Sequence, residues 1–391
     1  VAEAAKELSA ENKIYIPVGG PATSWWFQNF DANTIITAER SLIYELIKFC
    51  YRYRLPLDFI SWHAYSTDPK TEKETTIYKK TGIALLRDWL SYFDFDRNTP
   101  LIIDEWNYDT NANILPERKE KSFISASYIP SRIKNMYEAG IDYQLYFALE
   151  DFQNNKEGIV RNVGIFSFDS EAPEYKGAPK AIYNIFRMLS NLGQNKFSAS
   201  LKPNDEFVDV IATKTQDRIA LLIYNYIDPE IARNYLSRNI SALNGAQRKA
   251  LLNIITSSRL EKIMSHSIEI SKIRASKRLK TLLTRAQELN ERAEKFKSGA
   301  RNIKMSIKNL KGNYSYQRYK IDSSCSINCA FNPFEEKELN LSDAYQERLT
   351  LNPYSVNMII LTKKQPAEPE STVGLEPQQP TAGNIEKAAQ E

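Results

Sequence analysis

Polar and aromatic side chains follow several apolar runs of the sequence, at points where strands are expected to end. Glu105 stands in the segment TPLIIDEWNYD, and His63 and Tyr65 stand in LPLDFISWHAYS. A carboxylate, an imidazole and a phenol can hydrogen-bond the hydroxyls of a sugar, and aromatic rings can stack on its apolar faces. These residue types therefore indicate a carbohydrate site. The other candidates at strand ends are Gly19, Gly20, Pro21, Trp106, Asn107, Glu150 and Asp151.

The spacing of His63 and Tyr65 strengthens this interpretation. Alternate residues of a strand lie on the same face, so both side chains are expected to point into one site. Each candidate taken alone also fits an ordinary role: Glu105 as a solvated residue paired with a lysine or arginine, His63 as a structural histidine, and Trp106 as a core residue.

Strand and helix patterns alternate through the first half of the chain. Short apolar runs predict four strands, within residues 12–20, 55–65, 99–106 and 141–151. Apolar residues at helical spacing predict helices that follow them, over 39–54, 80–93, 125–140 and 178–193. Four such units with nearly continuous apolar strands predict an α/β fold with a parallel sheet. Half of a (β/α)8 TIM barrel over residues 1–192 fits this pattern best.

The pattern changes in the second half. Apolar and polar residues alternate within residues 193–364, which predicts an antiparallel β-sandwich domain with one solvated face. Residues 229–300 interrupt this domain with leucines and isoleucines at helical spacing, almost no glycine or proline, and basic runs such as KIRASKRLK. They predict a helical insertion, in the form of a hairpin. The tail at 365–391 is rich in Pro, Glu and Gln and is predicted to be disordered.

Composition narrows the possible classes of protein. The 391 residues are 42% hydrophobic with a net charge of +4, which predicts a globular protein and gives no indication of nucleic acid binding. No apolar run is long enough to span a membrane. The three cysteines have no metal-ligand spacing with either histidine, so neither a metal nor a cofactor is expected, and the spacing of Cys325 and Cys329 permits a disulfide. Compartment and oligomeric state stay open.

Four segments occur in the order, and at about the separations, seen in family 39 glycoside hydrolases: PVGGPATSWW, LPLDFISWHAYS, TPLIIDEWNYD and GAPKAIYNIFRMLSNLG. The sequence thus resembles this family of β-xylosidases and α-L-iduronidases over about residues 1–227. The segments NYSYQRYKIDSSCSIN and LNPYSVNMIIL resemble strands of its accessory β-sandwich. The resemblance implies strands five to eight of the barrel, which is its C-terminal half.

The resemblance also implies site residues and a reaction. Glu105, at the end of strand seven, would be the nucleophile of a retaining hydrolase acting on non-reducing-end glycosides. Its carboxylate would attack the anomeric carbon while a second carboxyl, about 5–5.5 Å away, protonates the leaving oxygen. His63 and Tyr65 would hydrogen-bond the nucleophile or the sugar, and Trp106 would form an apolar wall. Substrate binding would further involve Asn107, Glu150 and Asp151.

Two departures from the family pattern stand out. The family's acid/base belongs to an Asn-Glu pair at the end of strand four, and no such pair precedes the segment NKIYIPVGG, so we expect the acid/base to be missing from this chain. The segment EDFQNNKEGIVRNVGIFSFD differs from the strand-eight loop of the family's xylosidases, which leaves the choice between a xyloside and a uronide open.

A competing hypothesis is a non-catalytic relative that binds carbohydrate through the barrel face or a polyanion through the insertion. Basic residues outnumber acidic ones in 229–300, which could suit an acidic polysaccharide. The simpler interpretation is a solvated helix face, because few aromatic residues interleave the charges. The sequence therefore predicts a glycosidase with a saccharide substrate, with polyanion binding as the alternative.

Overall fold

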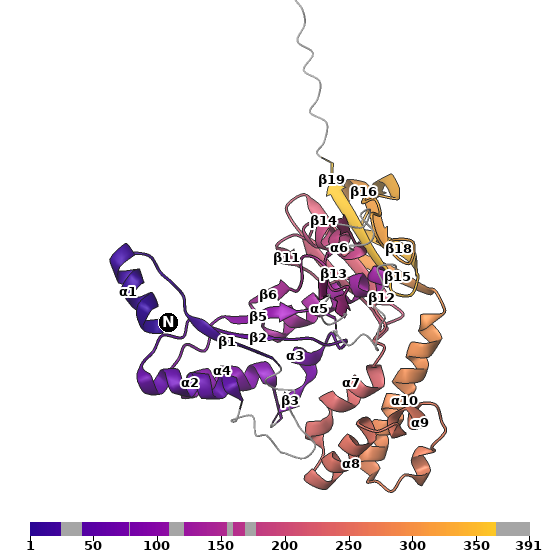
Figure 1. Cartoon of the computed structure of the whole chain (residues 1–391). Coiled ribbons are helices and arrows are strands. Elements are labelled where there is room, and N and C mark those ends of the chain that lie inside the picture. Colours follow the sequence, from indigo (N-terminus) through magenta and orange to yellow (C-terminus); the bar gives the residue numbers. More distant parts are fainter. Residues whose placement is uncertain (25–40, 78, 109–120, 155–158, 169–176, 365–391) are drawn as a thin grey trace, which may run out of the picture.

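The computed structural model describes residues 1–24, 41–77, 79–108, 121–154, 159–168 and 177–364. Within these residues the chain forms a parallel sheet flanked by helices, two antiparallel sheets, and a separate group of helices (Figure 1). The fold is thus α/β, as the sequence predicts. The tail at 365–391, predicted to be disordered, lies outside the described residues.

The parallel sheet has four strands in the order β1-β2-β5-β6. Their bounds are β1 (Gly19–Ser24), β2 (Phe59–His63), β5 (Leu101–Trp106) and β6 (Tyr143–Tyr146). A Cβ at Gly19 would lie 2.2 Å from the carbonyl oxygen of Phe59, so only glycine allows β1 to approach β2 this closely. The first strand begins later than predicted, since Ile14 and Tyr15 are largely exposed and form no strand.

Helices cover the parallel sheet with their apolar stripes. They are α2 (Leu42–Tyr53), α4 (Gly82–Tyr92), α5 (Ser122–Ala139) and α6 (Ala181–Leu189), whereas α1 (Ala2–Asn12) projects away from the sheet (Figure 1). The side chains of Ile43 and Ile47 on α2, Leu86 on α4 and Ile185 on α6 are fully buried in one shared core. Gly140 ends α5 in a left-handed conformation with φ 90°, as the sequence indicates.

Several short elements connect these units. They are α3 (Thr71–Glu74), β3 (Thr76–Ile77), β4 (Lys80–Thr81), β7 (Phe152–Asn154), β8 (Ile159–Arg161), β9 (Phe166–Ser167) and β10 (Ala178–Pro179). The loop that carries α3 follows directly on β2, at the edge of the sheet where the strands end.

Two antiparallel sheets follow, with strand orders β11-β13-β14-β19-β16-β17 and β12-β15-β18. The bounds are β11 (Asn195–Lys196), β12 (Ser200–Lys202), β13 (Val208–Lys214), β14 (Arg218–Asn225), β15 (Arg301–Lys308), β16 (Gly312–Ile321), β17 (Glu335–Leu341), β18 (Ala344–Leu351) and β19 (Val356–Lys363). Cys325 and Cys329 form a disulfide, and Cys50 is a buried free thiol.

The central strands β14 and β19 of the larger sheet lack the solvated face that the sequence predicts, whereas the edge strand β17 is largely exposed. On one face, Leu221 shares a core with Met305 and Leu349 of the smaller sheet. On the other face, Leu222 shares the core of the parallel-sheet helices. Because its strands β14 and β19 are buried on both faces, their sequences RIALLIYN and VNMIILTK are almost continuously apolar rather than alternating.

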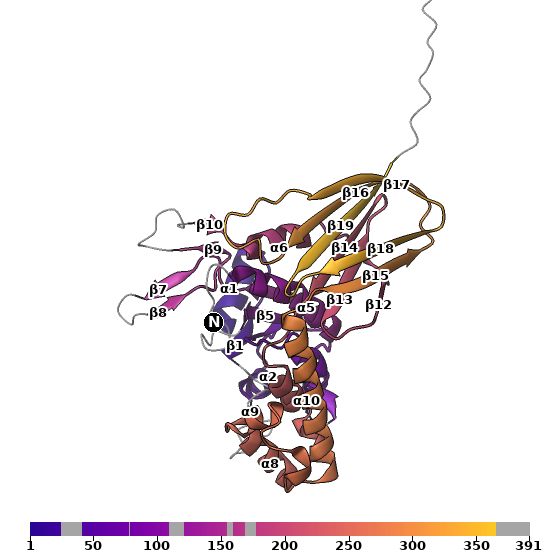
Figure 2. The ribbon, with the colours of Figure 1, turned by 90° about the vertical axis from the view of Figure 1, so that its right-hand side faces the viewer.

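The insertion is a small helical group with its own core, not a simple hairpin. Its helices are α7 (Ile231–Arg238), η4 (Ile240–Ala242), α8 (Gly245–Ile255), α9 (Arg259–Met264), η5 (Ile270–Lys272) and α10 (Lys277–Lys297). Figure 2 shows this group extending away from the antiparallel sheets as a lobe. Its first helix, α7, lies against the loop that follows β2, since Asn234 Nδ2 donates to Thr67 Oγ1 at 3.0 Å. A hydrogen bond of 2.6 Å also joins Ser241 of η4 to Thr76 of β3.

None of the described helices combines the length and the apolar character that crossing a membrane requires.

Candidate active site

An irregularity at the end of β5 places two consecutive carboxylates around one histidine. Trp62 pairs with Ile103 and His63 with Glu105, so β5 contains one residue more than β2 at this point. Such a β-bulge changes the direction in which neighbouring side chains point. As a result, Asp104 and Glu105 both reach His63, with distances of 3.7 Å from Nε2 to Asp104 Oδ1 and from Nδ1 to Glu105 Oε2.

The carboxylate of Glu105 is held on its other side by Tyr65, whose hydroxyl donates a hydrogen bond to Oε1. Burial and this hydrogen bond raise the pKa of the Tyr65 phenol, so the hydroxyl stays protonated and serves as a donor. The Glu105 side chain is 30% exposed. The carboxylate is therefore oriented by protein groups and still accessible from solvent.

The expected convergence of His63, Tyr65 and Glu105 is thus present in the structure. The Tyr65 ring also lies edge-on to Phe147, with 6.4 Å between ring centroids, so an aromatic residue that follows β6 borders the site. Sequence analysis missed both Phe147 and Asp104. The only signal for Asp104 was its place beside Glu105, because strict alternation would direct the two side chains to opposite faces.

Trp106 and Asn107, by contrast, are buried beneath the site. Trp106 has no exposed surface, donates its indole N–H to Gln144, and packs edge-on against Tyr146 at 5.1 Å between ring centroids. The amide nitrogen of Asn107 donates to the carbonyl oxygens of Phe147 and Val163. The predicted role of Trp106 as an apolar wall is therefore not supported, because Trp106 follows Glu105 in β5 and its side chain points to the opposite face, into the core.

The two acidic residues after β6 are in different environments. Asp151 is almost fully buried, and its Oδ1 accepts from Lys180 Nζ at 2.7 Å and from the backbone N–H of Gly164 at 2.7 Å. Burial raises the pKa of the Asp151 carboxyl, and the ion pair with Lys180 opposes this effect. Glu150 is exposed. Asp151 is thus a structural ion-pair partner here, and Glu150 is the residue of the two that a ligand can reach.

In the described part of the chain, no three histidine, cysteine, aspartate or glutamate side chains lie close enough together to bind a metal ion. The described side chains of the site provide a carboxylate with an adjacent phenol donor and an adjacent imidazole.

Comparisons with known proteins show which family this chain resembles. The model of Glycosyl hydrolases family 39 matches residues 2–240. A β-xylosidase from Caldicellulosiruptor saccharolyticus is 24% identical over 217 residues, which are 54% of this chain and 40% of that protein.

Two solved structures show the same fold. A glucosidase from Croceicoccus marinus has a TM-score of 0.59 at 17% identity, and a monomeric β-xylosidase from Caulobacter crescentus has a TM-score of 0.53 at 14% identity. In both comparisons 93% of this chain and 64% of the other chain are covered. The chain thus spans less than two thirds of the length of these relatives. Because the family match extends over more than half of the sequence, the chain belongs to family 39 of the glycosyl hydrolases.

Proposed function

We propose that this chain carries the nucleophile of a retaining glycoside hydrolase that acts on non-reducing-end glycosides, and that Glu105 is this nucleophile. The observation that supports the proposal most directly is the accessible carboxylate of Glu105 at the end of β5, held by the hydroxyl of Tyr65 and flanked by His63. A nucleophilic carboxylate must be both oriented and reachable, and Glu105 meets both requirements.

The proposed reaction has two steps. Glu105 attacks the anomeric carbon and forms a glycosyl ester, while an acid protonates the leaving oxygen; water, deprotonated by the same group, then releases the sugar. Tyr65 donates to the carboxylate whenever it is free, before attack and again as it departs. His63 lies within reach of a sugar hydroxyl on the same side. In this proposal Glu150 contributes to substrate binding, whereas Asn107 and Asp151 support the loops around the site.

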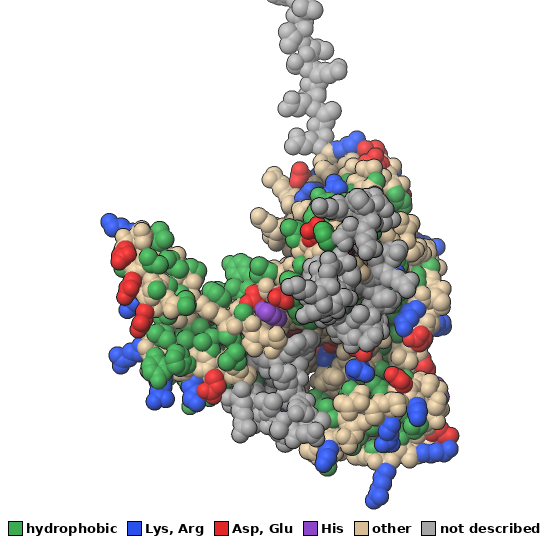
Figure 3. All heavy atoms as spheres, in the orientation of Figure 1, with side chains coloured by type: hydrophobic (Ala, Val, Ile, Leu, Met, Phe, Trp, Pro, Cys, Tyr) green, Lys and Arg blue, Asp and Glu red, His purple; other side chains and the backbone are tan. Residues whose placement is uncertain are grey.

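We further propose that β1, β2, β5 and β6 are strands five to eight of a (β/α)8 barrel, and that residues 193–364 form a β-sandwich domain with the insertion. In the described part of the chain, β1 and β6 each have a strand on one side alone. Hydrophobic side chains gather at the surface beside β1 and over α1 and α2, including Phe49 and Tyr51, which are about half exposed (Figure 3). Four further strands with their helices would cover this surface, and the acid/base would come from them.

The names of the relatives bear on the substrate. The names of the two β-xylosidases and the glucosidase support a xyloside or a related glycoside, and the proposed substrate is xyloside-like or uronide-like. The hydroxyls of a pyranose can donate hydrogen bonds to the carboxylates of such a site.

Trapping the intermediate tests this proposal. The complete protein would be treated with a 2-deoxy-2-fluoro xyloside that has a dinitrophenyl leaving group. The fluorine slows both steps and the good leaving group rescues the first alone, so the ester accumulates. Mass spectrometry should find the label on Glu105, in the peptide that contains LIIDEWNYD.

Variants add a control for folding. Glu105→Ala should lose the label and nearly all turnover, and added azide should restore release of the leaving group by occupying the space of the missing carboxylate. A label on Asp104, Glu150 or Asp151, or normal turnover by Glu105→Ala, would refute the assignment.

The alternative function, polyanion binding through the insertion, has less support. Arg285 and Arg292 on α10 both pair with Glu206, and Arg238 pairs with Asp68, so these cations are already engaged. Titration of the protein with polygalacturonate at low and high salt tests the alternative. Tight binding that weakens steeply with salt, in a protein that no 2-fluoro glycoside labels, would favour it over the glycosidase.

A further inference from the structure

The loop at residues 66–75 connects the proposed site to the helical insertion. It begins directly after Tyr65, the residue that holds Glu105, and it contains α3. Although the loop lies next to the site, Thr67 and Asp68 are only 2% and 3% exposed. Because Thr67 and Asp68 follow Tyr65 closely in the chain, the residues that bury them can determine the position of Tyr65.

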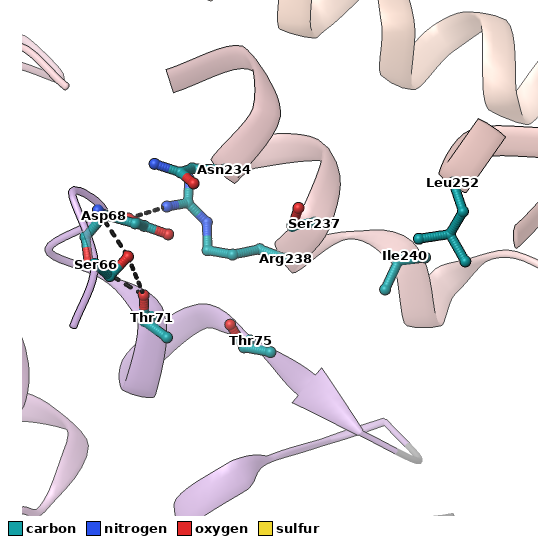
Figure 4. Close-up of a pocket in the computed structure, with 9 residues that line it drawn as sticks. All are labelled: Ser66, Asp68, Thr71, Thr75, Asn234, Ser237, Arg238, Ile240 and Leu252. Atoms are coloured by element: carbon teal, nitrogen blue, oxygen red, sulfur yellow. Dashed lines mark hydrogen bonds and ion pairs between the residues drawn. The ribbon is translucent and has the colours of Figure 1, made fainter. Parts of the chain in front are cut away.

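Helix α7 of the insertion contacts this loop through two side chains on one face. Asn234 and Arg238 are four residues apart, so they lie one turn apart on the same side of the helix. Asn234 Nδ2 donates to Thr67 Oγ1 at 3.0 Å, and the Arg238 guanidinium donates to Asp68 Oδ1. Arg238 Nε also lies 3.2 Å from Glu74 Oε2. Figure 4 shows Asp68 and Arg238 pointing toward one another across the gap between the loop and α7.

This junction relies on a few polar contacts rather than on continuous packing. A cavity of about 190 Å³ lies between the loop and the insertion, lined by Ser66, Thr71, Thr75 and Ser237 together with Asp68 and Arg238. The ion pair of Arg238 with Asp68 spans this junction, beside the hydrogen bonds of Asn234 with Thr67 and of Ser241 with Thr76. Asp68 is almost fully buried, so removing Arg238 would leave a buried carboxylate without its ion-pair partner.

The other contacts of the loop come from elsewhere. The hydroxyl of Tyr128 on α5 donates to the carbonyl oxygen of Ser66 at 2.5 Å, and that of Tyr226, just after β14, donates to the carbonyl oxygen of Thr67 at 2.7 Å. These bonds hold the backbone near Tyr65. Arg132 on α5 also donates to the carbonyl oxygens of Asp68 and Pro69 and forms a buried ion pair with Glu72 of the loop. The side-chain carboxylate of Asp68, in turn, accepts from Arg238 and from the backbone N–H of Lys70.

We infer that Arg238 is a positioning residue for the active site: through Asp68 it fixes the loop at residues 66–75 and thereby keeps the Tyr65 hydroxyl on Glu105. The helical insertion then stabilises the position of the loop at residues 66–75. This inference rests on the proposed function, since the consequence of a displaced Tyr65 is a slower glycosidase reaction. Arg238 itself does not contact Glu105 and acts through the loop.

A double-mutant cycle in the complete protein tests the inference. Arg238→Met should lower kcat about tenfold, no more than Tyr65→Phe does, and Arg238→Lys should recover part of the loss because it keeps the charge. In the Tyr65→Phe background, Arg238→Met should have little further effect, since the contact it protects is already absent. Arg285→Met serves as a matched control in the same insertion, because Arg285 pairs with Glu206 and Glu288 and does not contact the loop.

Amide hydrogen exchange gives a second readout that does not need activity. The peptide covering residues 66–75 should exchange at least tenfold faster in Arg238→Met than in the unaltered protein, and Arg285→Met should leave it unchanged. If Arg238→Met does not fold, Asp68→Asn removes the same ion pair and should give the same pattern.

The possible failures are distinguishable. Unchanged exchange in the loop would overturn the inference even if the glycosidase function holds, and so would a kinetic loss in Arg238→Met that is undiminished by Tyr65→Phe. The protein could instead lack glycosidase activity while its loop still exchanges faster in Arg238→Met. This result would refute the proposed function, but it would support the role of Arg238 in fixing the loop, without a catalytic consequence.

Discussion

Replacing Tyr65 by phenylalanine should slow the second step of the proposed reaction more than the first. The hydroxyl of Tyr65 donates to the Glu105 carboxylate and so stabilises it when it is charged and free. In the glycosyl ester that charge is largely lost, and the hydrogen bond is weaker. The hydrogen bond becomes stronger as the carboxylate departs in the second step, and it therefore assists that step. In the first step the same hydrogen bond makes the nucleophile more stable and less reactive.

The size of the effect follows from the environment of the pair. A hydrogen bond to a charged group contributes about 1.5–3 kcal/mol, and about 1.4 kcal/mol corresponds to a factor of ten in rate. The Glu105 side chain is 30% exposed, so water can partly replace the missing hydroxyl, which places the effect at the lower end of this range. We expect kcat to fall about tenfold, with a smaller change in kcat/KM and hence a lower KM.

Steady-state kinetics with an aryl xyloside, together with the size of the pre-steady-state burst, measure both steps. Tyr65→Phe should show a larger burst than the unaltered protein because the ester accumulates. Tyr92→Phe is a matched control, since Tyr92 on α4 is 75% exposed. An unchanged kcat in Tyr65→Phe, or a fall in kcat/KM larger than the fall in kcat, would show that the hydroxyl does not act on the departing carboxylate.

Two further predictions concern stability. Arg132 and Glu72 form a bidentate ion pair with 0% and 2% exposure; Arg132→Met should therefore lower the free energy of unfolding by about 3–5 kcal/mol in urea titrations, and adding Glu72→Met should restore most of it. A single-variant loss below about 1 kcal/mol would contradict this. Burial alone would raise the pKa of Glu138, but ion pairs with Lys196 and Lys73 outweigh it and lower this pKa to about 2. Because the folded pKa lies below the ordinary 4.5, Glu138 stabilises the fold at neutral pH, and this contribution is lost as the pH falls from about 4.5 toward 2. Glu138→Gln should thus be less stable at pH 7 and equally stable near pH 2, and a difference that persists in acid would refute the argument.

The arrangement of the site's main residues could be predicted from the sequence because it depends on a general property of parallel sheets. Their strands all end at one edge, so polar residues after separate apolar runs meet there. This places His63, Tyr65 and Glu105 together without knowledge of any side-chain contact. Trp106 follows Glu105 directly, so alternation along β5 directs its side chain to the opposite face, and the prediction of an apolar wall did not take this into account. The bulge instead explains why Asp104 lies beside Glu105, which no periodic pattern reveals.

Features that depend on contacts between distant segments were not predictable. The double burial of β14 follows from helices and strands that pack on both of its faces. The attachment of the insertion depends on Arg238, which in the sequence is one of many basic residues in a helical region. Arg238 differs from the other basic residues because it pairs with the buried carboxylate of Asp68, which lies 170 positions earlier in the chain. Local patterns therefore predict elements and strand ends, whereas the partners of individual charges require the structure.

The two residues that define the proposed site differ in what fixes them in space. Glu105 belongs to β5, which has a strand on both sides, so the sheet itself sets its position. Tyr65 comes after β2 has ended, and its position depends on the loop it leads into, which Tyr226 and Arg238 hold from 159 and 170 positions away in the sequence. Changes in the antiparallel sheets or the insertion should therefore reach the chemistry through Tyr65 and leave Glu105 in place. Such changes should have the same kinetic effect as Tyr65→Phe, namely a loss of rate mainly in the step in which the carboxylate departs.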